Sequence, residues 1–82
     1  MTDNGQPSTV QPEQWRVYIR HAEEEEYVVE AAAAQGSGVV VDMGVDGRGA
    51  YSNIRFASED DAKDFTSRHV NDFKYVSVPF RV

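Results

Sequence analysis

The sequence contains no cysteine, which excludes disulfide bridges, thiolate metal sites and a cysteine nucleophile. Basic side chains are also scarce, because 8 lysines and arginines stand against 14 aspartates and glutamates, for a formal charge of −6. This balance argues against a protein whose whole surface binds phosphate. No apolar run approaches the roughly 18 residues of a membrane-spanning helix. These absences predict a cytoplasmic protein that does not contact a membrane.

The 82 residues divide into a tail and one small domain. Residues 1–14 (MTDNGQPSTVQPEQ) are mostly turn and linker residues with little apolar area to bury, which predicts a disordered N-terminal tail. This segment has neither the basic start nor the apolar stretch of a signal peptide. From Trp15 the pattern changes sharply, and we expect residues 15–82 to form the domain.

Alternating apolar and polar residues predict strands over residues 15–21 and 73–82. Two further strands are predicted over residues 39–43 and 51–57. Asp46 and Gly47 predict a tight hairpin between the middle two. Pro79 has no N–H to donate to a ladder, so the last strand is predicted at an edge of the sheet. In that strand we expect an inward face of Val76, Val78, Phe80 and Val82, and an outward face of Tyr75, Ser77, Pro79 and Arg81.

Two helices are predicted between these strands. In residues 22–35 (AEEEEYVVEAAAAQ), glutamate and alanine favour a helix, and the early glutamates suit the positive end of its dipole. The second helix is predicted over residues 59–70, where Ser58 and Asp61 have the capping-box spacing and apolar side chains recur at helical intervals. The stripe of the first helix expected to face the sheet is Val28, Ala31, Ala32 and Gln35.

The resulting order, β-α-β-β-α-β, predicts an α+β fold of the ferredoxin-like type. In this two-layer sandwich, an antiparallel sheet with strand order 4-1-3-2 carries both helices on one face. Right-handed crossovers leave few other topologies for this order of elements. The last strand lies at an edge of such a sheet, which agrees with the presence of Pro79 in it.

Charged residues separate between the two predicted layers. The helices carry nine acidic and two basic side chains, a net charge of −7, and the rest of the chain sums to +1. The acidic helical surface is defined as Glu23, Glu24, Glu25, Glu26, Glu30, Glu59, Asp60, Asp61 and Asp64. The outward residues of the strands form a second surface, the Tyr/Arg sheet surface, which consists of Arg16, Tyr18, Arg20, Tyr51, Asn53, Arg55, Tyr75 and Arg81.

Two segments resemble motifs of RNA-recognition-motif domains. VYIRHA at residues 17–22 is similar to the first-strand motif of that family, in which an aromatic residue follows an aliphatic one. RGAYSNIRFASEDDAKDF at residues 48–65 is similar to the third-strand motif and the helix after it. The resemblance implies that the outer face of the sheet binds single-stranded nucleic acid by base stacking.

The same resemblance assigns roles to individual residues. Tyr18 corresponds to the stacking aromatic of the first strand, and Tyr51 to the outer aromatic of the third strand. Asn53 stands where the family has its central third-strand aromatic, so no stacking is implied there. Gly49 stands at the position of a basic residue, with Arg48 next to it.

No motif of an enzyme is present, because the sequence has no glycine-rich phosphate loop, nucleophile elbow or HExxH pattern. Acylphosphatases share the predicted fold, and Arg20 and Asn53 distantly resemble their arginine and asparagine, but the glycine-containing loop before the arginine is missing. The topology also brings His21, His69 and Asp46 to one edge, a set that fits a two-histidine, one-carboxylate metal site. Because histidines at strand and helix ends are far more often structural, we expect no metal site. With the catalytic motifs absent as well, we expect neither an enzyme nor a cofactor.

These patterns predict a small acidic, non-enzymatic binding or regulatory protein. We expect a protein partner, contacted through the acidic helical surface or the Tyr/Arg sheet surface. An inhibitor whose acidic helices mimic nucleic acid is one form of this hypothesis. The alternatives are a single-stranded nucleic-acid-binding module that uses the Tyr/Arg sheet surface, a homodimer through the sheet, and an ordinary solvated sheet surface.

Overall fold

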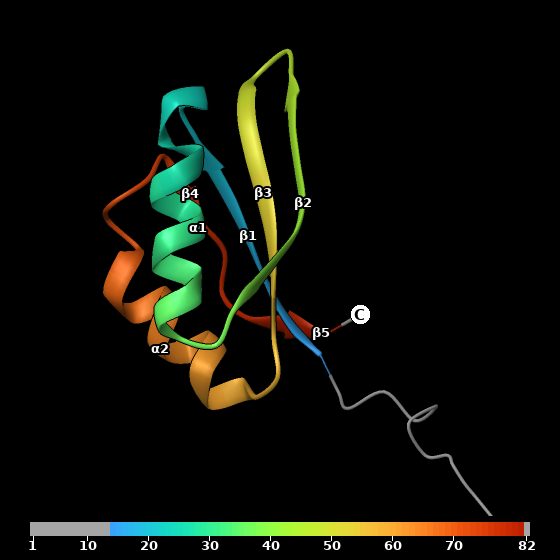
Figure 1. Ribbon diagram of the computed structural model, residues 1–82, viewed down its shortest axis with the longest axis vertical. Coiled ribbons are helices and arrows are strands. Elements are labelled where there is room, and N and C mark those ends of the chain that lie inside the picture. Colours follow the sequence, from blue (N-terminus) through green and yellow to red (C-terminus); the bar gives the residue numbers. More distant parts are fainter. Residues whose placement is uncertain (1–13, 82) are drawn as a thin grey trace, which may run out of the picture.

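The computed structural model describes residues 14–81 (Figure 1). Residues 1–13 of the predicted tail and Val82 of the predicted last strand lie outside this part of the chain. The elements are β1 (Trp15–His21), the 3-10 helix η2 (Glu23–Glu25), α1 (Glu26–Gln35), β2 (Val39–Asp46), β3 (Gly49–Phe56), α2 (Glu59–His69), β4 (Tyr75–Val76) and β5 (Phe80–Arg81). The fold is therefore α+β, as the sequence predicts.

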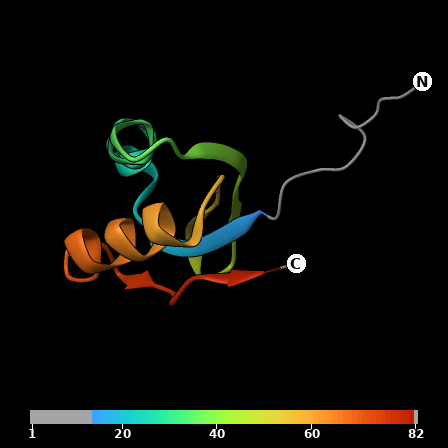
Figure 2. The same cartoon turned by 90° about the horizontal axis from the view of Figure 1, so that it is seen from below.

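All strand pairs are antiparallel, and the sheet has the order β2-β3-β1-β4, with β5 also paired to β1. Both helices lie on the same side of this sheet (Figures 1 and 2). The opposite side, which we call the open sheet face, is covered by no helix of the described residues. In none of the helices between residues 14 and 81 is there a stretch long and apolar enough to cross a membrane.

The core fills the space between the sheet and the two helices. The fully buried Phe56 and Ile54 of β3 pack there, and the Phe56 ring lies 5.4 Å from the ring of Phe65 on α2. Ser58 caps α2 as predicted, because its hydroxyl accepts a hydrogen bond from the Asp61 N–H at 3.1 Å. The buried hydrophobic cluster comprises Val17, Ile19, Val29, Ala32, Ala33, Ile54, Phe56, Ala62, Phe65 and Val76.

The inward stripe predicted for the first helix is wrong in part. Val29, Ala32 and Ala33 are its buried residues, whereas Val28 is 39% exposed. The run of alanines makes the helix nearly uniform around its circumference, so the sequence pattern hardly distinguishes one stripe from the next. The helix also begins with the three 3-10 residues of η2, which turn by a larger angle per residue and shift the stripe that follows.

The predicted last strand is interrupted. Ile19 pairs with Val76, but Arg16 pairs with Phe80, so the C-terminal segment has one residue more than β1 between these pairs. A shift of one residue exchanges the two faces of a strand, and the prediction of an inward Phe80 and an outward Arg81 is therefore wrong. The interruption falls at residues 77–79, where Pro79 offers no N–H.

Ser77 fixes the position of this interruption. Its N–H donates to the Tyr18 carbonyl at 2.9 Å, and its hydroxyl accepts from the Tyr18 N–H at 2.8 Å. A side-chain oxygen thus takes the place of a backbone carbonyl in the ladder. The predicted outward position of Ser77 is wrong, since this residue is buried, and Val78 is 74% exposed instead of facing inward.

Candidate functional site

The open sheet face carries seven of the eight residues predicted for the Tyr/Arg sheet surface. Directly opposed residues of neighbouring strands share one face of a sheet. The register of β1 with β3 therefore places Arg16 beside Arg55, Tyr18 beside Asn53 and Arg20 beside Tyr51. Tyr75 joins them opposite Arg20. Arg81 does not, because it pairs with Trp15 on the helix-covered face, where its guanidinium carbon lies 5.5 Å from the indole centroid.

Three tyrosines form a cluster at one end of this face. The rings of Tyr18 and Tyr51 stack with their centroids 6.1 Å apart and an interplanar angle of 26°. The Tyr75 ring lies 6.3 Å from that of Tyr18 and is tilted by 57°. Tyr75 is 53% exposed, whereas the other two are partly buried. The cluster is therefore packed before any partner arrives, with one ring open to solvent.

Arg20 covers this cluster and is held in place by Asp46. Its guanidinium carbon lies over both stacked rings, 5.7 Å from the Tyr18 centroid and 5.4 Å from that of Tyr51. The guanidinium donates to both carboxylate oxygens of Asp46, at 3.0 and 2.7 Å, and to the Gly49 carbonyl at 3.2 Å. Only 13% of the Arg20 side chain is exposed. Arg20 thus orders the cluster rather than offering a free charge.

The ion pair changes the pKa of both partners. The hydrogen bonds from Arg20, and next that from the Arg48 N–H at 2.8 Å, lower the pKa of Asp46 to about 2. The hydrogen bond to Asp46 raises the pKa of Arg20 above its ordinary value. Both groups therefore stay charged at neutral pH, and the pair persists there.

Gly44 of β2 completes the cluster, and sequence reasoning missed it. It lies opposite Tyr51, and a Cβ at this position would approach the Tyr51 hydroxyl oxygen to 2.5 Å and the adjoining ring carbon to 2.6 Å. The tyrosine ring therefore lies across the glycine, a known pairing of an aromatic with a strand glycine. A glycine inside a predicted strand is the sequence signal for such a close approach.

The other end of the open sheet face is more basic. Arg16 and Arg55 lie there as direct neighbours, with Phe80 opposite Arg16 and Val39 opposite Arg55. Phe80 is 39% exposed and was predicted to face inward, so the register shift adds an aromatic side chain to this face. The predicted residue Asn53 sits between the two ends.

The acidic helical surface is divided into two groups. The helices run in opposite directions, so the N-terminus of η2 and α1 and that of α2 lie at opposite ends of the molecule (Figure 1). On α2, Glu59 pairs with Lys63 at 3.4 Å and Asp64 with Arg68 at 2.9 Å. On η2, a carboxylate oxygen of Glu25 accepts from the backbone N–H of the preceding loop at 2.8 Å. Of the residues that define this surface, those that are exposed and form no ion pair within residues 14–81 are Glu23, Glu24, Glu30 and Asp60.

The two histidines have separate structural roles. His21 is fully buried; its Nδ1 lies 2.7 Å from the Ala22 carbonyl and its Nε2 2.7 Å from the Ser52 hydroxyl. His69 pairs with Asp72 at 2.8 Å. Asp46 is engaged by Arg20 on the open sheet face. Across residues 14–81, no three His, Asp or Glu side chains are grouped so as to hold a metal ion.

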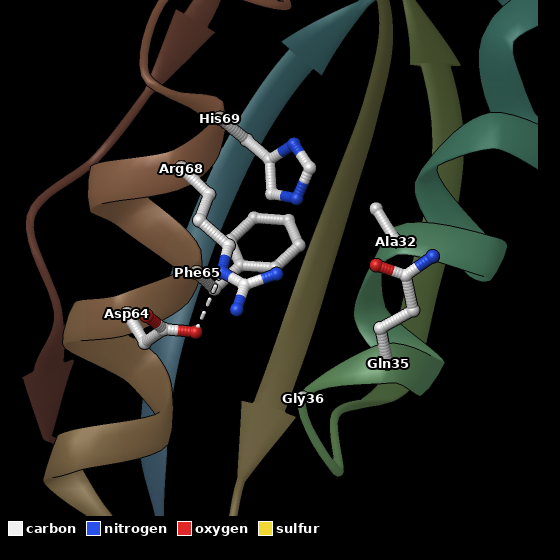
Figure 3. A pocket seen from close by; sticks show the side chains of 7 residues that line it. All are labelled: Ala32, Gln35, Gly36, Asp64, Phe65, Arg68 and His69. Atoms are coloured by element: carbon white, nitrogen blue, oxygen red, sulfur yellow. Dashed lines mark ion pairs between the residues drawn. The ribbon is translucent and has the colours of Figure 1, made fainter.

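A small pocket lies between the two helices (Figure 3). Its volume of about 20 Å³ is enough for one water molecule and far below that of a cofactor site. Asp64 and Arg68, which form an ion pair, and the ring of Phe65 lie along it on α2. The pocket is lined by Ala32, Gln35, Gly36, Asp64, Phe65, Arg68 and His69.

The candidate site is therefore a surface rather than a cavity: an ordered tyrosine cluster with an internally paired arginine at one end, and two neighbouring arginines at the other. Comparison of the chain with protein-family models, with curated proteins and with solved structures gave no match.

Proposed function

We propose that this protein is a non-enzymatic binding module of the cytoplasm that engages a partner protein through the open sheet face. The observation that carries the proposal is the tyrosine cluster of Tyr18, Tyr51 and Tyr75, packed and covered by Arg20 on a face without helices. Tyrosine and arginine are the side chains most often found at the energetic centre of protein interfaces. A binding module of this kind acts by occupying its partner, and a regulatory or inhibitory role is proposed in that sense.

The ordering of the cluster supports binding with small entropic loss. Immobilising a side chain on association costs about 0.5–1.5 kcal/mol. Here Arg20 is already fixed by Asp46, and Tyr51 is fixed between Gly44 and Tyr18. A partner therefore meets rings that already have one arrangement, and most of the gain from burying them contributes to affinity.

The acidic helical surface gives less support as the contact surface. A mimic of nucleic acid needs its negative charges in one continuous track, as phosphates are spaced along a strand. Here the two acidic groups lie at opposite ends of the molecule, and two of the carboxylates on α2 are paired with basic side chains. We therefore place the partner on the sheet and not on the helices.

Single-stranded nucleic acid is the second candidate ligand of the same face. Tyr18 with Tyr51 on the outer side of β1 and β3 favours it, in line with the resemblance to RNA-recognition-motif domains. Arg20 lies over both rings, however, and Asp42 and Asp46 are on this face too, so a stacked base and a phosphate have less room and less attraction. This candidate predicts salt-sensitive anisotropy changes with a labelled oligonucleotide, lost in Tyr18→Ala; no binding at low salt rejects it.

We further propose that the chain is a ferredoxin-like domain with strand order 4-1-3-2. The sheet order β2-β3-β1-β4 supports this when β4 and β5 are counted as one interrupted fourth strand, since both pair with β1. The two helices on one side of the sheet agree with it. A homodimer through the sheet would use the same open face, and light scattering over a concentration series separates it from a complex with another protein.

The test of the proposed function compares two exposed tyrosines. Tyr75→Ala removes the exposed ring of the cluster, and Tyr27→Ala removes a ring that is 73% exposed on α1, in the other layer. Tagged wild type and both variants are used to capture proteins from a nuclease-treated lysate of the source organism. We expect a partner that is retained by the wild type and Tyr27→Ala and lost by Tyr75→Ala. Equal capture by all three folded proteins rejects the sheet as the contact surface.

A further inference from the structure

Arg16 and Arg55 form a pair of like charges at the basic end of the open sheet face. They are directly opposed in the β1–β3 ladder, an arrangement that destabilises a sheet. The protein has 14 acidic side chains, yet the ion pairs found within residues 14–81 involve only Arg20, Lys63, Arg68 and His69. The Nε of Arg16 is buried and has no hydrogen-bond partner among the described residues. Within residues 14–81, these two neighbouring arginines are thus without a counter-charge.

A hollow of about 190 Å³ lies next to Arg55, where β1 and β2 begin and β3 ends. Gln14, Ser37, Val39, Arg55, Phe56 and Ala57 line it. The guanidinium of Arg55 donates to the side-chain oxygen of Gln14 at 3.5 Å, and both residues line this hollow. The volume is below that of pockets for whole small molecules, but it can admit a single carboxylate or phosphate group.

Ser37 is the second unusual feature of this hollow. Its φ of 64° lies in the left-handed region, and it is the single non-glycine residue between positions 14 and 81 with a positive φ. The position follows the end of α1, where glycine is the residue that adopts this conformation without strain. A serine there keeps a hydroxyl at the rim of the hollow at the expense of backbone strain, and strained residues of this kind gather at binding sites.

We propose that Arg16 and Arg55, together with Gln14 and Ser37, form a subsite for one oxyanion, the carboxylate of an acidic side chain or chain end of the partner. A carboxylate supplies the missing counter-charge, and the arginine fork binds it through two parallel hydrogen bonds. The C-terminal end of α1 opposes this with about half a negative charge, less than the two positive charges of the arginines. Asp42 lies on the same face, and Arg20 is neutralised by Asp46, so the face attracts a single anion and disfavours a chain of phosphates.

The assignment of this anion to a partner rests on the proposed function, but anion binding itself is tested without a partner. Sodium acetate and inorganic phosphate serve as probes, with sodium chloride at matched ionic strength as the reference. The Nε–Hε resonances of the arginines are followed by NMR in the full chain. We expect saturable shifts at Arg16 and Arg55 with millimolar dissociation constants, and no saturable shift at Arg48, an exposed arginine in the hairpin.

Three variants complete the test. Arg16→Gln and Arg55→Gln are each expected to weaken acetate binding at least tenfold, and Arg48→Gln to leave it within twofold. Because the two arginines repel each other, neither substitution should unfold the protein. Arg55→Lys keeps the charge without the fork, so an intermediate loss is expected. Shifts that rise linearly with concentration, or that persist in Arg55→Gln, overturn the subsite. That result would leave the comparison of Tyr75→Ala with Tyr27→Ala unaffected, so the two proposals fail separately.

Discussion

The contact between Gly44 and Tyr51 allows the tyrosine cluster to be tested by adding a single methyl group. In Gly44→Ala, the new Cβ would lie 2.5 Å from the Tyr51 hydroxyl oxygen and 2.6 Å from the adjoining ring carbon. Non-bonded heavy atoms in van der Waals contact are separated by about 3.5 Å or more. The ring must therefore retreat by about 1 Å, which it can do because the clash is at its outer end and not in the backbone. The Tyr18–Tyr51 stack is the contact that this movement disturbs.

Two opposing contributions set the size of the effect. Loss of the aromatic pair costs about 0.5–1.5 kcal/mol, in addition to the free energy that comes from burying the area of the rings. Alanine in place of glycine within a strand gains about 0.5–1 kcal/mol in backbone entropy. We expect Gly44→Ala to lower the free energy of unfolding by at most about 1 kcal/mol. In a Tyr51→Ala background no ring opposes the methyl group, and the same substitution should stabilise the protein by about 0.5–1 kcal/mol.

The assay is a double-mutant cycle by urea unfolding, with Gly44→Ala, Tyr51→Ala and the pair. The backbone gain cancels in the cycle, so the expected coupling is that of the lost aromatic pair, about 0.5–1.5 kcal/mol. Independent sites add to within roughly 0.3–0.5 kcal/mol. Gly47→Ala in the hairpin is the matched control, because nothing lies within 4 Å of a Cβ there. Additive effects at positions 44 and 51 would refute the packing of the ring across the glycine, and with it the ordered cluster on which the proposed function depends.

Two further predictions concern stability and pH. Gly38→Ala places a Cβ 2.7 Å from the buried ring of Phe56 and 2.8 Å from the Ala33 carbonyl, neither of which can move freely, so we expect a loss of about 2–3 kcal/mol in urea unfolding. The pKa of Asp46 is lowered from 3.8 to about 2, so the stability it contributes through Arg20 is complete above pH 4 and is lost as the pH falls toward 2. The difference in unfolding free energy between wild type and Asp46→Asn should therefore be constant above about pH 4 and shrink below it, and a difference independent of pH would contradict the ion pair.

The strands that the sequence predicts best are those with strict alternation. Over residues 15–21 and 51–56 each inward side chain is either apolar or hydrogen-bonded. A slip of the register by one residue would expose the whole core face, so the register follows from the pattern. The first helix lacks such a signal, because alanine packs equally well on any side of it. Its helical character is predicted correctly, but the stripe that faces the sheet is not.

The site is predicted less well, because its contacts join distant parts of the chain. Alternation alone places Tyr18, Arg20 and Tyr51 on one face. It cannot indicate that Arg20 is bound by Asp46, 26 residues away, or that this predicted contact residue lies over the rings of Tyr18 and Tyr51. The exchange of Phe80 for Arg81 depends on the hydroxyl of Ser77 entering the ladder beside Tyr18, and a serine within an alternating segment carries no sign of that.

These contacts divide the open sheet face into two ends that favour different chemical groups of a partner. At the tyrosine end the charge of Arg20 is neutralised by Asp46, so what that end offers a partner is aromatic area. At the other end Arg16 and Arg55 have no counter-charge among residues 14–81, so that end attracts an acid. Arg16 and Arg20 are four residues apart on β1, which separates the two ends by about 13 Å at 3.3 Å per residue. A partner segment that contacts both ends in an extended conformation therefore carries an acidic side chain and, about four residues away, an apolar or aromatic side chain.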